Sequence, residues 1–113
     1  MLASFSLVGQ LAIVQGLDYS HTFEFSNDSG EPLDMSDRTA IAQLFHRGDK
    51  VADFVCDIDI GSINISLTAA TTATLPLGMR GDFTWILVEQ FIVDSKKFPL
   101  FRGHAEVQSG LAS

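Results

Sequence analysis

The fold class is decided by the stretch Tyr19-Ser20-His21-Thr22-Phe23-Glu24-Phe25-Ser26, in which rings occupy the odd positions and non-aromatic, mostly small polar side chains the even ones. Successive side chains of a β-strand point to opposite faces, so this repeat of two residues predicts a strand with one face buried and one face in water. The segment that follows, Asn27-Asp28-Ser29-Gly30, is typical of a turn because its side chains bond to nearby backbone and its Gly accepts a positive φ.

The same repeat recurs along the rest of the chain. Residues 40–45 and 51–60 are predicted to form an antiparallel hairpin closed by residues 47–50, and residues 63–67 alternate as another strand. The last strand or strand pair is predicted over residues 98–101 and 104–107, bent near Gly103 and at the edge of the sheet where Pro99 lacks an N–H.

Two segments differ from this pattern. Thr68 followed by two alanines predicts one helical turn near 69–74. Residues 83–89 are apolar at both odd and even positions, which predicts a central strand covered on both faces. The chain is therefore expected to be all-β: an antiparallel β-sandwich, Ig-like or jelly-roll-like, with about six to eight strands.

Because 46% of the residues are hydrophobic, the composition favours one folded domain over residues 1–113. The ends of the chain, residues 1–9 and 108–113, are expected to be flexible. The 14 acidic and 7 basic residues give a net charge of −7, which disfavours nucleic acid as a partner. Neither a secretion signal nor an apolar run of about 20 residues is present, so no membrane association is expected. The single Cys56 cannot form an internal disulfide.

The residues that could carry chemistry do not form a recognisable site. His21, His46, His104 and Cys56 do not occur at the spacing of structural zinc ligands. Asp53, Asp57 and Asp59 share one strand face and could bind calcium or pair for acid–base work, but calcium loops carry Gly and more oxygen ligands, so a solvated face is favoured. Phosphate loops and nucleophile elbows are also missing. We therefore expect no catalytic residues, no metal, no cofactor and no enzymatic activity.

Five segments, spread over most of the chain, follow one another in a recognisable order: Val14-Gln15-Gly16-Leu17-Asp18-Tyr19, then Ser29-Gly30-Glu31-Pro32-Leu33-Asp34-Met35-Ser36, then Ile65-Ser66-Leu67-Thr68-Ala69-Ala70-Thr71-Thr72-Ala73-Thr74-Leu75-Pro76-Leu77-Gly78, then Gly81-Asp82-Phe83-Thr84-Trp85-Ile86-Leu87-Val88, and finally Leu100-Phe101-Arg102-Gly103-His104-Ala105-Glu106-Val107. Their order resembles the small virion proteins of tailed bacteriophages, especially the β-sandwich modules of baseplate and tail-fibre-adaptor proteins. The chain departs from the resemblance over residues 83–101, where more polar outward positions would be expected.

The resemblance implies a structural protein of the virion, made in the host bacterial cytoplasm and built into the tail, the baseplate or the fibre attachment. Its partners would be other virion structural proteins and further copies of itself in a symmetric homo-oligomer, with a trimer as one candidate. A capsid decoration protein is the alternative.

An apolar patch near Trp85, Phe91, Phe98 and Phe101 is the predicted protein interface, while the competing interpretation places these aromatics in the core. A third possibility is a carbohydrate-binding module in which Tyr19 or Trp85 stacks on a sugar.

Overall fold

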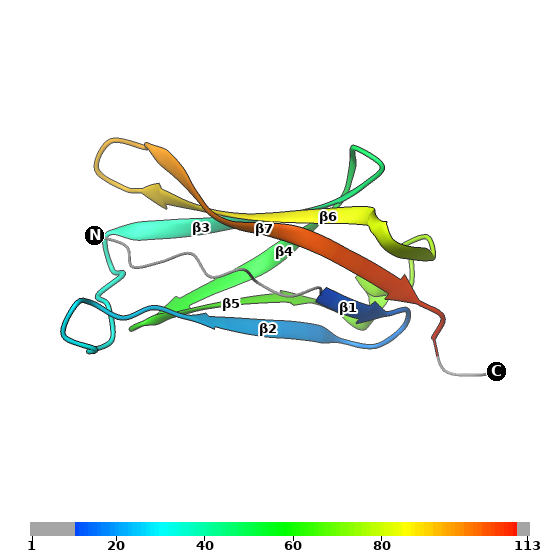
Figure 1. Cartoon of the computed structure of the whole chain (residues 1–113), viewed down its shortest axis with the longest axis horizontal. Coiled ribbons are helices and arrows are strands. Elements are labelled where there is room, and N and C mark those ends of the chain that lie inside the picture. The colour runs from blue at the N-terminus through cyan, green and yellow to red at the C-terminus, as the bar shows by residue number, and fades with distance from the viewer. Residues whose placement is uncertain (1–10, 111–113) are drawn as a thin grey trace.

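The computed structural model describes residues 11–110, except for the side chains of residues 79–81, and is an all-β structure with one short helix (Figure 1). Its strands form a single seven-stranded sheet in the order β1-β7-β6-β3-β4-β5-β2. The prediction of an all-β chain is confirmed. The elements are β1 (Leu11–Val14), β2 (Tyr19–Glu24), β3 (Arg38–His46), β4 (Asp49–Asp59), β5 (Ser62–Leu67), α1 (Ala69–Thr72), β6 (Gly78–Phe91) and β7 (Lys97–Gln108).

Strand β4 connects the two halves of the sheet. Up to Phe54 it pairs with β3, and from Val55 onward it pairs with β5. The sheet therefore folds over, so that β2 and β5 lie across from β3, β6 and β7 (Figure 1). The Phe23 ring of β2 lies 5.7 Å from the Trp85 ring of β6 and 5.0 Å from the Phe101 ring of β7, which shows that the two halves enclose one core.

The core holds apolar side chains from every strand. Burying a side chain the size of Leu or Ile contributes about 1.5–3 kcal/mol each, so this cluster supplies most of the driving force for folding. Among its members are Ile13, Phe23, Leu44, Phe54, Ile63, Ile65, Phe83, Trp85, Leu87 and Val107.

One pair of strands corrects the expectation of a purely antiparallel sheet. β1 runs parallel to β7, with Leu11 beside Ala105 and Ile13 beside Val107. A tight turn fixes an antiparallel direction only for strands that follow each other in sequence. β1 and β7 stand at opposite ends of the described chain, so no local signal encodes their relative direction.

The local predictions at the helix and at the first hairpin are confirmed. Thr68 caps α1, because its Oγ1 accepts a hydrogen bond from the Thr71 N–H at 3.3 Å. The hairpin turn is shorter than the predicted residues 47–50, because Asp49 and Lys50 already belong to β4. Arg47 and Gly48 have φ values of 51° and 91° and connect His46 to its partner Asp49, which makes a two-residue hairpin turn with positive φ at both positions.

The closing region is one strand, β7, as one of the two predicted alternatives had it. Its register against β6 shifts in two places, between Gly78 and Thr84 and between Leu87 and Val88, where Pro99 faces Val88. Gly103 pairs with Trp85 between these two shifts. The prediction that Pro99 stands at a sheet edge is confirmed: β1 begins to pair with β7 only at Ala105, so within the described chain the first half of β7 is paired by β6 alone.

Most of the chain ends predicted to be flexible, residues 1–9 and 111–113, lie outside the described residues. Gln108 is the last residue of β7, and its carbonyl accepts a hydrogen bond from the Gln15 N–H at 3.1 Å. Over the described residues, no helix combines the length and the apolar character needed to cross a bilayer.

Candidate interaction surface

Strand β6 buries only one of its faces, which corrects the prediction of a strand covered on both sides. Phe83, Trp85 and Leu87 point into the core and are fully buried. On the opposite face Ile86 and Val88 are only half-buried. The folded sheet has its core on the inside, and α1, the one described helix, has four residues, so it does not form a layer over the outside.

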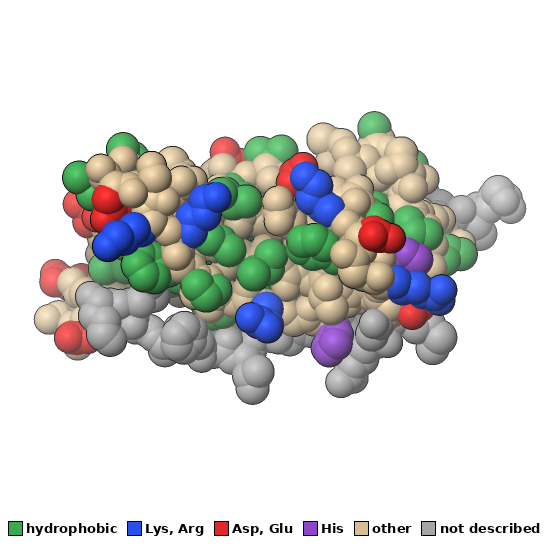
Figure 2. Space-filling model, turned by 90° about the horizontal axis from the view of Figure 1, so that it is seen from above, with side chains coloured by type: hydrophobic (Ala, Val, Ile, Leu, Met, Phe, Trp, Pro, Cys, Tyr) green, Lys and Arg blue, Asp and Glu red, His purple; other side chains and the backbone are tan. Residues whose placement is uncertain are grey.

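The outward side chains of four neighbouring strands form one continuous surface, named here the outer face. The register aligns Gln43 with Ile86 and Ile86 with Arg102, so these side chains stand in a row across β3, β6 and β7. Figure 2 shows hydrophobic side chains along the middle of the side seen from above, with charged side chains around them. The outer face comprises Ile41, Gln43, Phe45, Asp53, Thr84, Ile86, Val88, Pro99, Arg102 and His104.

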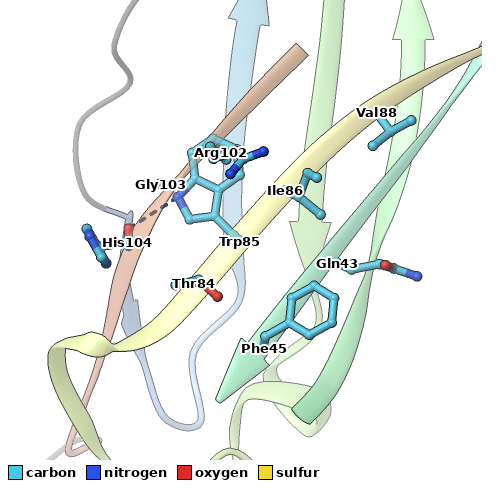
Figure 3. Close-up of a pocket in the computed structure, with 9 residues that line it drawn as sticks. All are labelled: Gln43, Phe45, Thr84, Trp85, Ile86, Val88, Arg102, Gly103 and His104. Atoms are coloured by element: carbon cyan, nitrogen blue, oxygen red, sulfur yellow. Dashed lines mark hydrogen bonds between the residues drawn. The ribbon is translucent and has the colours of Figure 1, made fainter. Parts of the chain in front are cut away.

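The outer face contains a shallow hollow of about 500 Å³. Phe45, Ile86 and Val88 supply its apolar lining, and Arg102 and His104 stand at the β7 side (Figure 3). An apolar surface with a polar rim is typical of the contact regions between proteins.

Trp85 is one of the residues that line the hollow, but its side chain belongs to the core. Its side chain is 1% exposed, and its Nε1 donates a hydrogen bond to the His104 carbonyl at 3.2 Å (Figure 3). Gly103 lies directly opposite, where an added Cβ would stand 3.0 Å from the indole Nε1. The missing side chain at Gly103 therefore makes room for the indole. Trp85 is not accessible to a protein partner or to a sugar.

The other three predicted interface aromatics lie in two places. Phe101 is half-buried and stacks on Phe23. Phe91 and Phe98 contact each other edge to face at 5.8 Å, and Phe98 is 46% exposed. The structure thus brings together only Phe91 and Phe98, at the turn between β6 and β7.

Sequence reasoning missed two apolar residues at this same turn. Ile92 and Val93 follow Phe91 directly in the sequence, and both are exposed. The signal was the apolar run Phe91-Ile92-Val93, which leads directly into a polar turn. Residues 91–98 are named here the hairpin tip.

A buried ion pair contacts the hairpin tip through Phe91. Arg38 Nη1 lies 2.7 Å from Glu89 Oε1, and the two side chains are 10% and 5% exposed. The Arg38 guanidinium also covers the Phe91 ring, 4.7 Å from its centroid. Both charges have partners, so the pair is a structural contact.

The acidic strand face is solvated, as predicted. Asp53, Asp57 and Asp59 are all exposed, and Asp53 forms an ion pair with Lys50 at 3.1 Å. Between residues 11 and 110, no three His, Cys, Asp or Glu side chains come together in a group that could hold a metal ion.

His21 and Cys56 differ from each other in burial. His21 lies on the ring-bearing face of the strand, which the sequence predicts to be the buried face, but its side chain is exposed and its ring contacts the Phe23 ring edge to face at 4.7 Å. Cys56 is half-buried, and burial raises the pKa of its thiol, which lowers its reactivity.

The chain matches no protein-family model and no curated protein sequence.

Proposed function

We propose that this chain is a non-enzymatic structural and assembly protein of a tailed-phage particle, acting in the tail, the baseplate or the fibre attachment. The observation that carries this proposal is the outer face, an apolar surface on the central strands of the sheet. The order of the five sequence segments, which resembles phage virion modules, supplies the setting.

The make-up of the outer face favours a protein partner. Ile41, Phe45, Ile86 and Val88 are apolar and half-buried on adjacent strands, and contiguous apolar patches on soluble proteins commonly mark contact sites. The net charge of −7 disfavours a phosphate backbone as the occupant. The hollow is shallow, and no group of metal ligands occurs in the described chain, so nothing there favours a substrate over a protein surface.

We also propose that the architecture is a β-sandwich module, with β1, β7, β6 and β3 in one layer and β5 and β2 in the other. The change of partners along β4 and the packing of Phe23 against Trp85 and Phe101 support this interpretation. The parallel contact between β1 and β7 distinguishes it from an Ig-like or jelly-roll-like sandwich made only of antiparallel pairs.

Capsid decoration is the second candidate, and the hairpin tip favours it. Exposed Ile92, Val93 and Phe98 form an apolar end that could insert between neighbouring shell subunits. Both candidates place the protein in the virion and differ only in the neighbour.

Immunogold electron microscopy and quantitative mass spectrometry of phage particles, purified from the bacterial strain that carries the gene, test the proposal. We expect the chain to copurify with the particles at a fixed ratio, with gold at the tail, the baseplate or the fibres. Gold over the capsid would support the decoration role instead. A chain that remains in the particle-free fraction would overturn both.

A further inference from the structure

We propose that the outer face binds a second copy of this chain about a twofold axis that lies between β3 and β6 and runs parallel to them. The inference rests on the proposed assembly function and names the partner of its surface. Two rows of side chains that run across the strands carry it. When either row is turned end to end and laid on the original, its side chains face suitable partners.

The first row is apolar throughout. Ile41 stands beside Val88, and Val88 stands beside Pro99. On the other side, β4 runs antiparallel to β3 as far as Phe54, which stands beside Ala42. The next residue, Val55, pairs with Ser66 of β5 and is 56% exposed although it is apolar. The row therefore reads Ile41, Val88, Pro99 across β3, β6 and β7.

The second row carries opposite charges at its two ends. Asp53 stands beside Gln43, Gln43 beside Ile86 and Ile86 beside Arg102. The acid therefore lies on β4 and the base on β7, separated by two uncharged side chains.

A twofold axis between β3 and β6 reverses each row onto itself. Asp53 of each copy then faces Arg102 of the other, and Gln43 faces Ile86. In the first row Ile41 faces Val88. Since a twofold contact uses the same patch on both subunits, a row with this order satisfies both copies at once.

The two charges are available for this contact. Arg102 is exposed and forms no ion pair within the described part of the chain. Asp53 is exposed and its one ion pair, with Lys50, is an exposed contact of the kind that contributes about 0–1 kcal/mol. Its carboxylate can therefore accept a second cation.

Charge reversal tests the arrangement, because each single change places like charges opposite each other. Asp53→Arg alone sets arginine against Arg102, and Arg102→Asp alone sets aspartate against Asp53. An equimolar mixture of the two variants, however, restores an acid and a base at both contacts. The double variant Asp53→Arg with Arg102→Asp restores them within one protein.

Light scattering over a concentration series gives the readout. We expect two chains for the protein itself, at least about a tenfold rise in the dissociation constant for each single reversal, and recovery in the mixture and in the double variant. Asp28→Arg and Lys96→Asp, exposed reversals of the same size outside the outer face, should leave the dissociation constant unchanged. Circular dichroism verifies that each variant is folded.

Three results would overturn the twofold contact: a single-chain or three-chain mass for the protein itself, single reversals that associate normally, or a mixture that fails to recover. The copurification with phage particles described above separates this failure from failure of the proposed function. If the mixture fails to recover but the unchanged chain still copurifies with phage particles, only the second copy is rejected as the partner. If the mixture fails to recover and the unchanged chain is also absent from the particles, the assembly role is rejected.

Discussion

Thr72 Oγ1 accepts a hydrogen bond from the Gly16 N–H at 3.0 Å and donates one to the Leu17 carbonyl at 2.9 Å, so the loop after β1 is fastened to α1. Asp18 adds a contact, because its Oδ1 accepts from the Ala69 N–H at 2.7 Å. Two of the segments that carry the phage resemblance are therefore in direct contact. Trp85 packs against Gly103, which brings segments 81–88 and 100–107 into direct contact as well. Segments 81–88 and 100–107 also supply outward side chains, so Ile86, Val88 and Arg102 belong to the outer face while Trp85 is buried in the core.

Thr72→Val should lower the free energy of unfolding by about 1–3 kcal/mol, because Thr72 is fully buried and the change leaves its backbone partners without a hydrogen bond. Urea denaturation followed by circular dichroism measures the change. Thr74→Val, at an exposed threonine in the same segment, is the matched control and should have a smaller effect. Equal losses in both variants would contradict the role of the buried hydroxyl.

Gly103→Ala should destabilise the fold by about 1–3 kcal/mol, because the new Cβ stands 3.0 Å from the Trp85 indole and the packed core must shift. Since Trp85 is the single tryptophan, its fluorescence reports the displacement as a shift to longer wavelength. Lys97→Ala, an exposed change in the same strand, should leave the emission unchanged. An unshifted spectrum in Gly103→Ala would show that the indole does not depend on this gap.

Glu89→Ala should cost about 3 kcal/mol of stability, because it leaves the Arg38 guanidinium largely buried without its closest partner. Replacing both residues with Met should recover most of the loss, since two apolar side chains leave no unpaired charge. Denaturation midpoints of the single and double variants provide the comparison. A double variant no more stable than Glu89→Ala would mean that the ion pair itself is the stabilising element.

Tyr19 should make stability fall at high pH. Burial raises the pKa of its phenol to about 12, whereas the same group in the unfolded chain titrates near 10. Its contribution is complete below about pH 10 and is lost as the pH rises toward 12, because the unfolded state releases the proton first. As Tyr19 is the single tyrosine, absorbance of the tyrosinate follows it directly, with and without urea. Coincident titration curves would contradict the effect of burial.

The elements predicted from sequence are those encoded within a few neighbouring residues. The alternation from Tyr19 to Glu24, the Thr68 cap and the Arg47-Gly48 turn each depend on local chemistry, and all three occur in the structure. The parallel contact of β1 with β7 and the space for Trp85 beneath Gly103 depend on residues far apart in sequence, so no local pattern contains them.

The outer face shows the same limit. Residues 83–89 carry apolar side chains on both faces of the strand. This pattern is equally compatible with a strand buried between two layers and with a strand that has one face free to bind a partner. Only the arrangement of the strands shows that Ile86 and Val88 lie outside the core.

The most direct test of the account is the mass in solution of Ile86→Glu, which places a charge at the centre of the outer face, compared with the unchanged chain and with Ile60→Glu. Ile60 is an exposed isoleucine in the turn after β4 and serves as the matched control. Light scattering should give two chains for the unchanged protein and for Ile60→Glu, but one chain for Ile86→Glu. One chain for all three proteins at every concentration, or two chains for all three, would contradict the claim that the outer face joins two copies.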